Sequence, residues 1–207
     1  MTDTTALDNF IEKWRSRWPE WQLAESFVPV VQREPALAWF ALLQEFEDIM
    51  NIAGDPLPAD AKLAWWGEEL RDWSRRRSRH PLGRVLEPHA APWFELGEKL
   101  PLLQALRKAQ GDEMLALATE LAQTLAVVEQ AILGGAQPDT LSMRAALLAS
   151  RPAGAELAAS GRDIPAQSQG SVPRRLWMAI HRLRAESRGS APSFWRILWR
   201  SWRAARG

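Results

Sequence analysis

Apolar residues recur along this chain every three or four positions, and this spacing constrains the fold more than any other feature. Leu7, Phe10, Ile11, Trp14 and Trp18 all fall on one face of a helix. Similar stripes follow along most of the chain, and we find no convincing alternation of apolar and polar residues of the kind that marks a strand. The pattern predicts an all-α protein, a single-domain helical bundle. We expect its helices at about 7–18, 19–31, 35–53, 59–75, 81–86, 92–109, 112–133, 138–149, 173–188 and 192–205.

Composition suggests how these helices are organised. The chain has 207 residues, of which 46% are hydrophobic and 25% charged. This suits a globular protein that can bury a hydrophobic core without disulfides or structural metal ions. We expect a helical domain over residues 1–150. Residues 151–171 are rich in Pro, Gly, Ala, Ser and Gln and should form a loop or linker. The last part, 172–207, should form basic helices packed on the same domain.

Several kinds of site are excluded by residue counts. The chain has no cysteine, so it holds no disulfide, thiolate metal site or cysteine nucleophile. Its three histidines, His80, His89 and His181, are too dispersed to suggest a zinc site. His80 precedes Pro81 at the start of an expected helix, where we expect it to close a loop through hydrogen bonds.

Charge is distributed unevenly along the chain. Residues 1–170 carry a formal net charge of −7, whereas residues 171–207 carry +8. This asymmetry indicates an anionic partner for the tail, or docking of the tail onto the acidic body. The N-terminus has no signal-peptide pattern and no apolar run approaches roughly 20 residues. We therefore expect a cytoplasmic protein, with peripheral attachment to the inner face of the membrane as an open alternative.

Carboxylates gather on two consecutive helices. Glu45, Glu47 and Asp48 lie on the helix expected at 35–53, and a further acidic group lies at 68–72. Acidic residues three or four positions apart on a helix point the same way and can share a Mg²⁺ ion, which prefers oxygen ligands. The alternative is an ordinary solvated helix face, and spacing alone favours this alternative.

Three segments resemble one known family in the right order. Residues 40–51 resemble the helix that carries the first aspartate-rich motif of the squalene/phytoene synthase family, particularly of its short bacterial members. Residues 62–70, Lys-Leu-Ala-Trp-Trp-Gly-Glu-Glu-Leu, resemble the family's Arg-Leu-x-Trp-Trp-x-(Asp/Glu)-x-Leu segment. Residues 80–86, His-Pro-Leu-Gly-Arg-Val-Leu, resemble the His-Pro-(Val/Leu)-x-x-x-Leu that follows it.

The resemblance implies an all-α isoprenoid synthase fold. In active members, two aspartate-rich motifs hold Mg²⁺, which draws the diphosphate off a prenyl substrate. Carried over to this chain, the metal residues would be Glu47, Asp48 and Asn51, where the family reads Asp-Asp-x-x-Asp. We find no second motif. The substrate cavity would be lined by Phe40, Trp65 and Trp66.

Three functions follow as hypotheses. The first is a protein that binds an isoprenoid or prenyl diphosphate through degenerate motifs, without the usual condensation. The second is an active Mg²⁺-dependent prenyl transferase with an altered motif. The third is a non-enzymatic accessory or assembly protein that keeps the fold as a scaffold at a membrane surface.

The twelve tryptophans have two expected uses. Most should pack in the core, including Trp14, Trp66, Trp73 and Trp93 on the predicted apolar stripes. Those of the last helix alternate with arginines, which is typical of a helix that lies on a membrane surface. The alternatives are docking of this Trp stripe on the protein's own body and, less favoured, binding of nucleic-acid phosphates. The candidate residues for an anionic membrane or partner are Trp195, Arg196, Trp199, Arg200, Trp202 and Arg203.

Overall fold

The computed structural model describes residues 3–151, 168–187 and 191–207, and every regular element in these ranges is helical. This confirms the all-α prediction. Most of the predicted linker, residues 152–167, lies outside the described residues. The elements are α1 (Asp3–Arg17), α2 (Trp21–Ala24), the 3₁₀ turn η1 (Glu25–Phe27), α3 (Val30–Met50), α4 (Leu57–Trp73), α5 (Pro81–Leu86), α6 (Trp93–Lys99), α7 (Pro101–Lys108), α8 (Gly111–Leu133), α9 (Thr140–Ala149), α11 (Val172–Glu186) and α12 (Phe194–Arg206).

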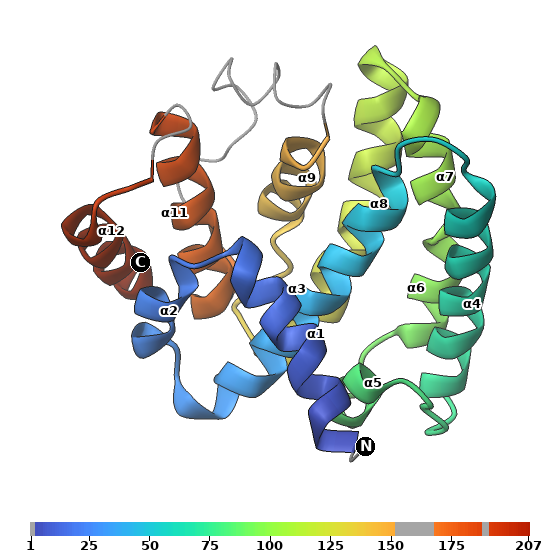
Figure 1. Ribbon diagram of the computed structural model, residues 1–207, viewed down its shortest axis with the longest axis horizontal. Coiled ribbons are helices and arrows are strands. Elements are labelled where there is room, and N and C mark those ends of the chain that lie inside the picture. Colours follow the sequence, from blue (N-terminus) through green and yellow to red (C-terminus); the bar gives the residue numbers. More distant parts are fainter. Residues whose placement is uncertain (1–2, 152–167, 188–190) are drawn as a thin grey trace.

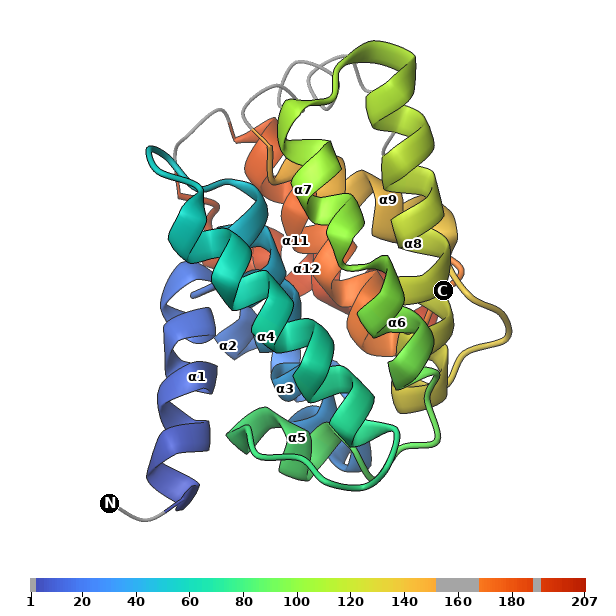
Figure 2. The same cartoon turned by 90° about the vertical axis from the view of Figure 1, so that its right-hand side faces the viewer.

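Helix α3 forms the centre of the bundle. It contacts α1, α4, α5, α7 and α8, and Figure 1 shows it crossing the middle of the molecule. Every residue from Ala36 to Phe46 is buried, so this stretch packs on all its faces. Helices α4 and α6 pack against one another along one side (Figure 2). Helices α11 and α12 lie at the opposite end of the molecule, where α11 contacts α9 and α12 contacts α2.

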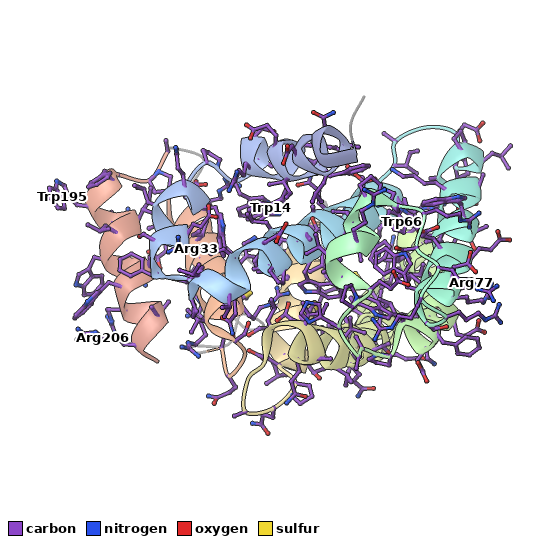
Figure 3. All side chains as sticks on the ribbon, turned by 90° about the horizontal axis from the view of Figure 1, so that it is seen from below. Trp14, Arg33, Trp66, Arg77, Trp195 and Arg206 are labelled. Atoms are coloured by element: carbon purple, nitrogen blue, oxygen red, sulfur yellow. The ribbon has the colours of Figure 1, made fainter. Side chains whose placement is uncertain are left out.

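Buried tryptophans fill much of the core, as their helical spacing predicts. Trp14, Trp66, Trp73 and Trp93 are all buried, and Figure 3 shows Trp14 beneath α1 and Trp66 inside the bundle. Trp66 meets Trp73 edge to face at 6.2 Å between ring centres, and Trp73 meets Trp93 in the same way at 5.0 Å. Such edge-to-face pairs add about 0.5–1.5 kcal/mol each beyond the area they bury.

Proline positions account for two differences from the predicted helices. The helix expected at 92–109 divides into α6 and α7, because Pro101 begins a new helix at its first residue. The helix expected at 19–31 is limited to α2 and η1, and α3 then begins at Val30, after Pro29. Pro35 therefore lies inside α3 rather than at its start. It removes a single backbone donor close to the beginning of a long helix, whose packing compensates for the loss.

Helix α8 is the one described element that is long and apolar enough to cross a membrane by length and mean hydropathy. Within its most apolar stretch, 44% of the residues are buried inside the protein. Leu121, Leu125 and Val128 belong to the common core, and α8 packs against α9, α7 and α3. Core helices of soluble proteins share this composition, and the buried contacts of α8 are those of a core helix.

A buried ion pair connects α8 to α11. The Arg174 side chain is fully buried, and its Nε donates to both carboxylate oxygens of Glu129 at 2.9 and 3.0 Å. Trp39 Nε1 of α3 donates to the same carboxylate at 2.7 Å. The guanidinium also lies over the Trp177 ring, 4.5 Å from its centre. Three helices therefore meet at one carboxylate, deep in the protein.

We predict that Glu129→Gln lowers the free energy of unfolding by about 3–5 kcal/mol, because it leaves the buried Arg174 charge uncompensated. Chemical denaturation would measure this loss. Glu120→Gln is the matched control on the same helix. Glu120 pairs with Lys99 at 2.6 Å on the surface, where such a pair contributes at most about 1 kcal/mol. Equal losses for the two variants would contradict the assignment.

Candidate functional site

Helix α12 docks on the body of the protein through one narrow face. Ile197 and Ser201 are 7% and 1% exposed, and Ala204 and Ala205 pack against the core. These residues lie on one face of the helix. At this end of the bundle α12 contacts α11, α2 and η1. Ser and Ala have short side chains, so α12 approaches its neighbours closely along this line.

The opposite face of α12 carries the tryptophans. Trp195, Trp199 and Trp202 are 74%, 51% and 41% exposed, and Figure 3 shows Trp195 at the outer edge of the molecule. The alternative in which the Trp stripe docks on the protein's own body is therefore wrong. The helix does dock, but through its small residues, because three indole rings would hold it away from α11 and α2.

Two of the α12 arginines lie against this aromatic face. The Arg203 guanidinium lies 4.7 Å from the centre of the Trp199 ring, and that of Arg206 lies 4.1 Å from the Trp202 ring. Cations in these positions are attracted by the ring quadrupole. Arg196 and Arg200 instead pair with Glu186 of α11 at 3.1 and 2.8 Å. The exposed face therefore combines large apolar rings with positive charge.

Arg175 of α11 holds the C-terminal end of α12. Its Nε donates to the Ala204 carbonyl at 2.8 Å and its Nη2 to the Ala205 carbonyl at 3.0 Å. Carbonyls in the last turn of a helix have no partner within the helix, and a cation there also complements the helix dipole. Sequence reasoning missed this role. Its only signal is the spacing of Arg175, Arg182 and Glu186 along one face of α11.

The residues expected to hold a metal are already engaged with other groups. The Asp48 carboxylate accepts from Lys13 at 3.0 Å and pairs with Arg17 at 2.7 Å. Asn51 Nδ2 donates to the Glu47 carbonyl at 3.0 Å and to Ser150 Oγ at 3.5 Å. Among the described residues, no three His, Asp or Glu side chains are grouped so as to hold a metal ion. This donor set does not fit Mg²⁺ as it stands, since two cations would have to leave Asp48 first.

Glu45, one turn before, is engaged in the same way. Its carboxylate bridges Lys13 at 2.8 Å and Lys62 at 2.5 Å. Burial opposes the charged form of Glu45, but the hydrogen bonds from these two lysines prevail and lower its pKa. The acidic side of α3 therefore serves to attach α1 and α4 to the centre of the bundle.

Glu47 differs from its neighbours because no cation of the described part of the chain pairs with it directly. Burial, and then repulsion by the adjacent Asp48, raise its pKa to about 7, against a weaker opposing effect of Arg17 and Arg174. The usual pKa of this side chain is 4.5. Near neutral pH a substantial fraction of Glu47 therefore holds a proton.

The three residues expected to line a substrate cavity lie apart in two environments. Phe40 is fully buried and stacks between Trp14 and Trp177, with ring centres 5.5 and 5.0 Å away. Trp66 is buried against the rings of Phe46 and Trp73, whereas its neighbour Trp65 is 38% exposed. The structure thus does not bring Phe40 together with the two tryptophans.

His80 behaves as its position before Pro81 predicts. Its Nδ1 accepts from the Leu82 amide at 3.2 Å and caps α5, which confirms the expected loop-closing hydrogen bond. The ring also packs against Phe10 and Trp66, with centres 4.5 and 4.6 Å away. Burial lowers the pKa of His80 to about 4, so the ring is neutral at physiological pH.

Comparisons with family models, with curated proteins and with solved structures found no match. Helix α12 is the feature of the described residues that most needs a functional explanation, because protein surfaces seldom expose three tryptophans on one helix face.

We predict that Glu47→Gln stabilises the protein relative to the wild type increasingly as pH rises from about 4.5 to about 7. Glu47 has a higher pKa in the folded state than in the unfolded state. Ionisation of Glu47 therefore lowers the stability of the wild-type protein. This loss is absent below pH 4.5, grows as pH rises and is complete above the pKa of the folded state. Glutamine is neutral throughout. Urea denaturation of both proteins at pH 5 and pH 7.5 would test this. The same stability difference at both values would contradict it.

Proposed function

We propose that this protein binds anionic membrane surfaces through α12 and serves there as a non-enzymatic accessory or assembly protein. The observation that carries the proposal is the exposure of Trp195, Trp199 and Trp202 on a helix whose opposite face is docked. A helix held in this way presents its rings outward along a line, so all three could enter one flat surface together.

The chemistry of the exposed face favours a lipid bilayer. Tryptophan is enriched at membrane interfaces, where its ring is buried among lipid groups while its N–H remains hydrated. Residues 194–207 include four arginines and no acidic residue. Each basic residue near an anionic surface contributes about 1 kcal/mol to binding. A helix with these two properties lies in the plane of the interface rather than across it.

The resemblance to squalene/phytoene synthases remains part of the proposal as the origin of the helical scaffold. Two observations favour a scaffold over a transferase. Asp48, at the centre of the implied metal motif, is held by Lys13 and Arg17. Phe40 and Trp66, implied to line a cavity, fill the core instead. The competing proposals are a protein that binds a prenyl diphosphate without condensing it and an active transferase.

We predict that replacing Trp195, Trp199 and Trp202 together with serine weakens binding to vesicles of phosphatidylglycerol and phosphatidylcholine by at least about 100-fold. Even partial transfer of three rings out of water should contribute more than about 3 kcal/mol, and about 1.4 kcal/mol corresponds to tenfold. Co-sedimentation over a range of lipid concentrations measures the change. Binding should also weaken at high salt and with neutral vesicles.

Trp65→Ser is the matched control, since it removes an exposed tryptophan from α4, which lies at the opposite end of the molecule from α12 (Figure 1). It should leave vesicle binding unchanged. Point variants are preferable to deletion of the tail, because Ile197 and Ser201 are buried and their loss would uncover the neighbouring helices. Absence of vesicle binding by the wild-type protein would overturn the proposal, and a protein partner for α12 would then replace it.

We further predict no Mg²⁺-dependent release of diphosphate from farnesyl or geranylgeranyl diphosphate, because Asp48 is engaged with two cations. Labelled substrate incubated with and without Mg²⁺ would test both binding and release. Release that is abolished by Glu47→Gln combined with Asp48→Asn would instead establish the transferase. Binding without release would support the prenyl-binding alternative.

A further inference from the structure

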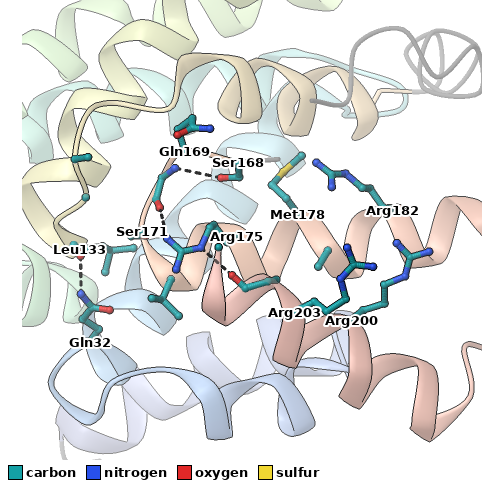
Figure 4. A pocket seen from close by; sticks show the side chains of 17 residues that line it. Gln32, Leu133, Ser168, Gln169, Ser171, Arg175, Met178, Arg182, Arg200 and Arg203 are labelled. Atoms are coloured by element: carbon teal, nitrogen blue, oxygen red, sulfur yellow. Dashed lines mark hydrogen bonds between the residues drawn. The ribbon is translucent and has the colours of Figure 1, made fainter. Parts of the chain in front are cut away.

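A cavity of about 580 Å³ lies beside the docked side of α12. It is bordered by α11, by α12, by residues 168–171 and by the end of α8 at Leu133 (Figure 4). Cavities of this size are typical of sites for small organic ligands. None of the residues implied by the squalene/phytoene synthase resemblance borders it.

Of the residues that the structure describes, four arginines border this cavity, namely Arg175 and Arg182 of α11 and Arg200 and Arg203 of α12. Among the described residues that line it, none is Asp or Glu. Two acidic side chains of the described residues act on this group. The Glu186 carboxylate pairs with Arg200 at 2.8 Å, and Glu186 and Asp139 both attract the Arg182 guanidinium electrostatically. Two carboxylates beside four guanidinium groups still leave an excess of positive charge among the described side chains.

The arginines are held in place by the fold. Arg175 donates to the Gly170 carbonyl at 3.0 Å as well as to the end of α12, so it forms a fixed part of the wall. Arg182 and Arg200 approach from different helices, and Figure 4 shows both near one end of the cavity with Arg203. Burial and then the charge of Arg200 lower the pKa of Arg182, against the opposing effect of Glu186 and Asp139. Like charges are therefore held close together at a cost that a bound anion would offset.

We propose that this cavity binds the terminal phosphate of a phosphomonoester or diphosphate compound, with Arg182, Arg200 and Arg203 around the phosphate. Guanidinium groups suit phosphate oxygens because their N–H donors form a planar fork that can bind two oxygens at once. A terminal phosphate carries close to two negative charges at neutral pH, which matches several arginines better than a singly charged diester does.

The remainder of the cavity suits an organic group attached to that phosphate. Leu133, Val172 and Met178 contribute apolar lining, and Gln32 and Ser171 contribute polar groups. Figure 4 places Leu133 and Gln32 at the end away from Arg182 and Arg200. A phosphate at the arginine end would therefore leave most of the volume for the rest of the molecule.

The cavity adjoins the aromatic face of α12 through one residue. Arg203 borders the cavity, and its guanidinium also lies over the Trp199 ring. A lipid headgroup with a terminal phosphate could therefore reach the arginines from a membrane in contact with the tryptophans. A soluble phosphate compound would use the same arginines, so the inference goes beyond the membrane proposal and does not require it.

Calorimetric titration of the full chain with inorganic pyrophosphate, in the absence of lipid, tests the cavity directly. We expect saturable binding that is weakened at least about tenfold by Arg200→Gln, because charge-assisted hydrogen bonds to phosphate are lost. Arg196→Gln is the matched control. Arg196 pairs with the same Glu186 but does not border the cavity, so its loss should leave pyrophosphate binding unchanged. Arg203→Gln provides a second variant in case Arg200→Gln fails to fold.

Vesicles distinguish the two sources of the phosphate. Phosphatidic acid has a terminal phosphate, whereas phosphatidylglycerol at the same surface charge does not. Tighter binding to phosphatidic acid that is lost in Arg200→Gln would identify a lipid headgroup. Equal binding to both vesicles, together with pyrophosphate binding in solution, would identify a soluble ligand. The triple tryptophan variant should lose vesicle binding and retain pyrophosphate binding, which separates failure of the membrane proposal from failure of this one.

Two results would overturn the inference. One is that the wild-type chain binds neither pyrophosphate nor phosphatidic acid in preference to phosphatidylglycerol. The other is that Arg196→Gln weakens pyrophosphate binding as much as Arg200→Gln, because the anion would then respond to the general charge of α12 and not to the cavity.

Discussion

The Glu129 carboxylate, buried between three helices, determines how the C-terminal part of the chain joins the rest. It accepts hydrogen bonds from Arg174 of α11 and Trp39 of α3 while belonging to α8 itself. A buried charge tolerates few alternative partners, because leaving it unpaired is costly. The position of α11 therefore follows from this contact. Helix α12 depends in turn on α11, since Arg175 binds its last carbonyls and Glu186 pairs with two of its arginines.

This succession of contacts explains why an amphipathic helix can dock and still expose its large apolar side chains. A helix with one apolar face usually buries that face, as α7 does with Leu103 and Leu106. Helix α12 instead packs through Ser201, Ala204 and Ala205, and polar contacts from α11 secure its position. The indole rings of α12 are thus not needed to hold the helix on the body of the protein. Their exposure is a property of the folded protein and does not need a conformational change.

The sequence was sufficient to predict the helices and much of the core, because both depend on local spacing. Trp14, Trp66, Trp73 and Trp93 lie on apolar stripes and are buried as those stripes predict. Helix boundaries near Pro29 and Pro101 were less accessible, because a proline can begin a helix or lie within one and only the packing of its neighbours decides. The docking face of α12 could not be predicted from amphipathicity, which favours burial of the tryptophans.

The candidate sites were predictable only in part for a related reason. Residue types on α3 suggested a metal site, yet Asp48 faces Lys13 and Arg17, which lie more than thirty positions earlier in the chain and on another helix. Likewise, the arginine cavity gathers residues from α11 and α12 with a loop segment that no local pattern connects to them. Contacts between distant segments decide whether a charged side chain is paired or available, and spacing along one helix does not reveal them.

The separation of charge along the chain becomes a separation in space once the chain folds. Helices α11 and α12, which together carry a net charge of +7, lie at one end of the molecule, while residues 3–151 carry −6. The protein thus has a large electric dipole moment that is directed along its length. In the field of a negatively charged surface such a molecule experiences a torque as well as a force, once it comes within roughly one Debye length of about 8 Å at physiological salt. It would turn its basic end toward that surface before any side chain makes contact, and the tryptophans of α12 lie at that end.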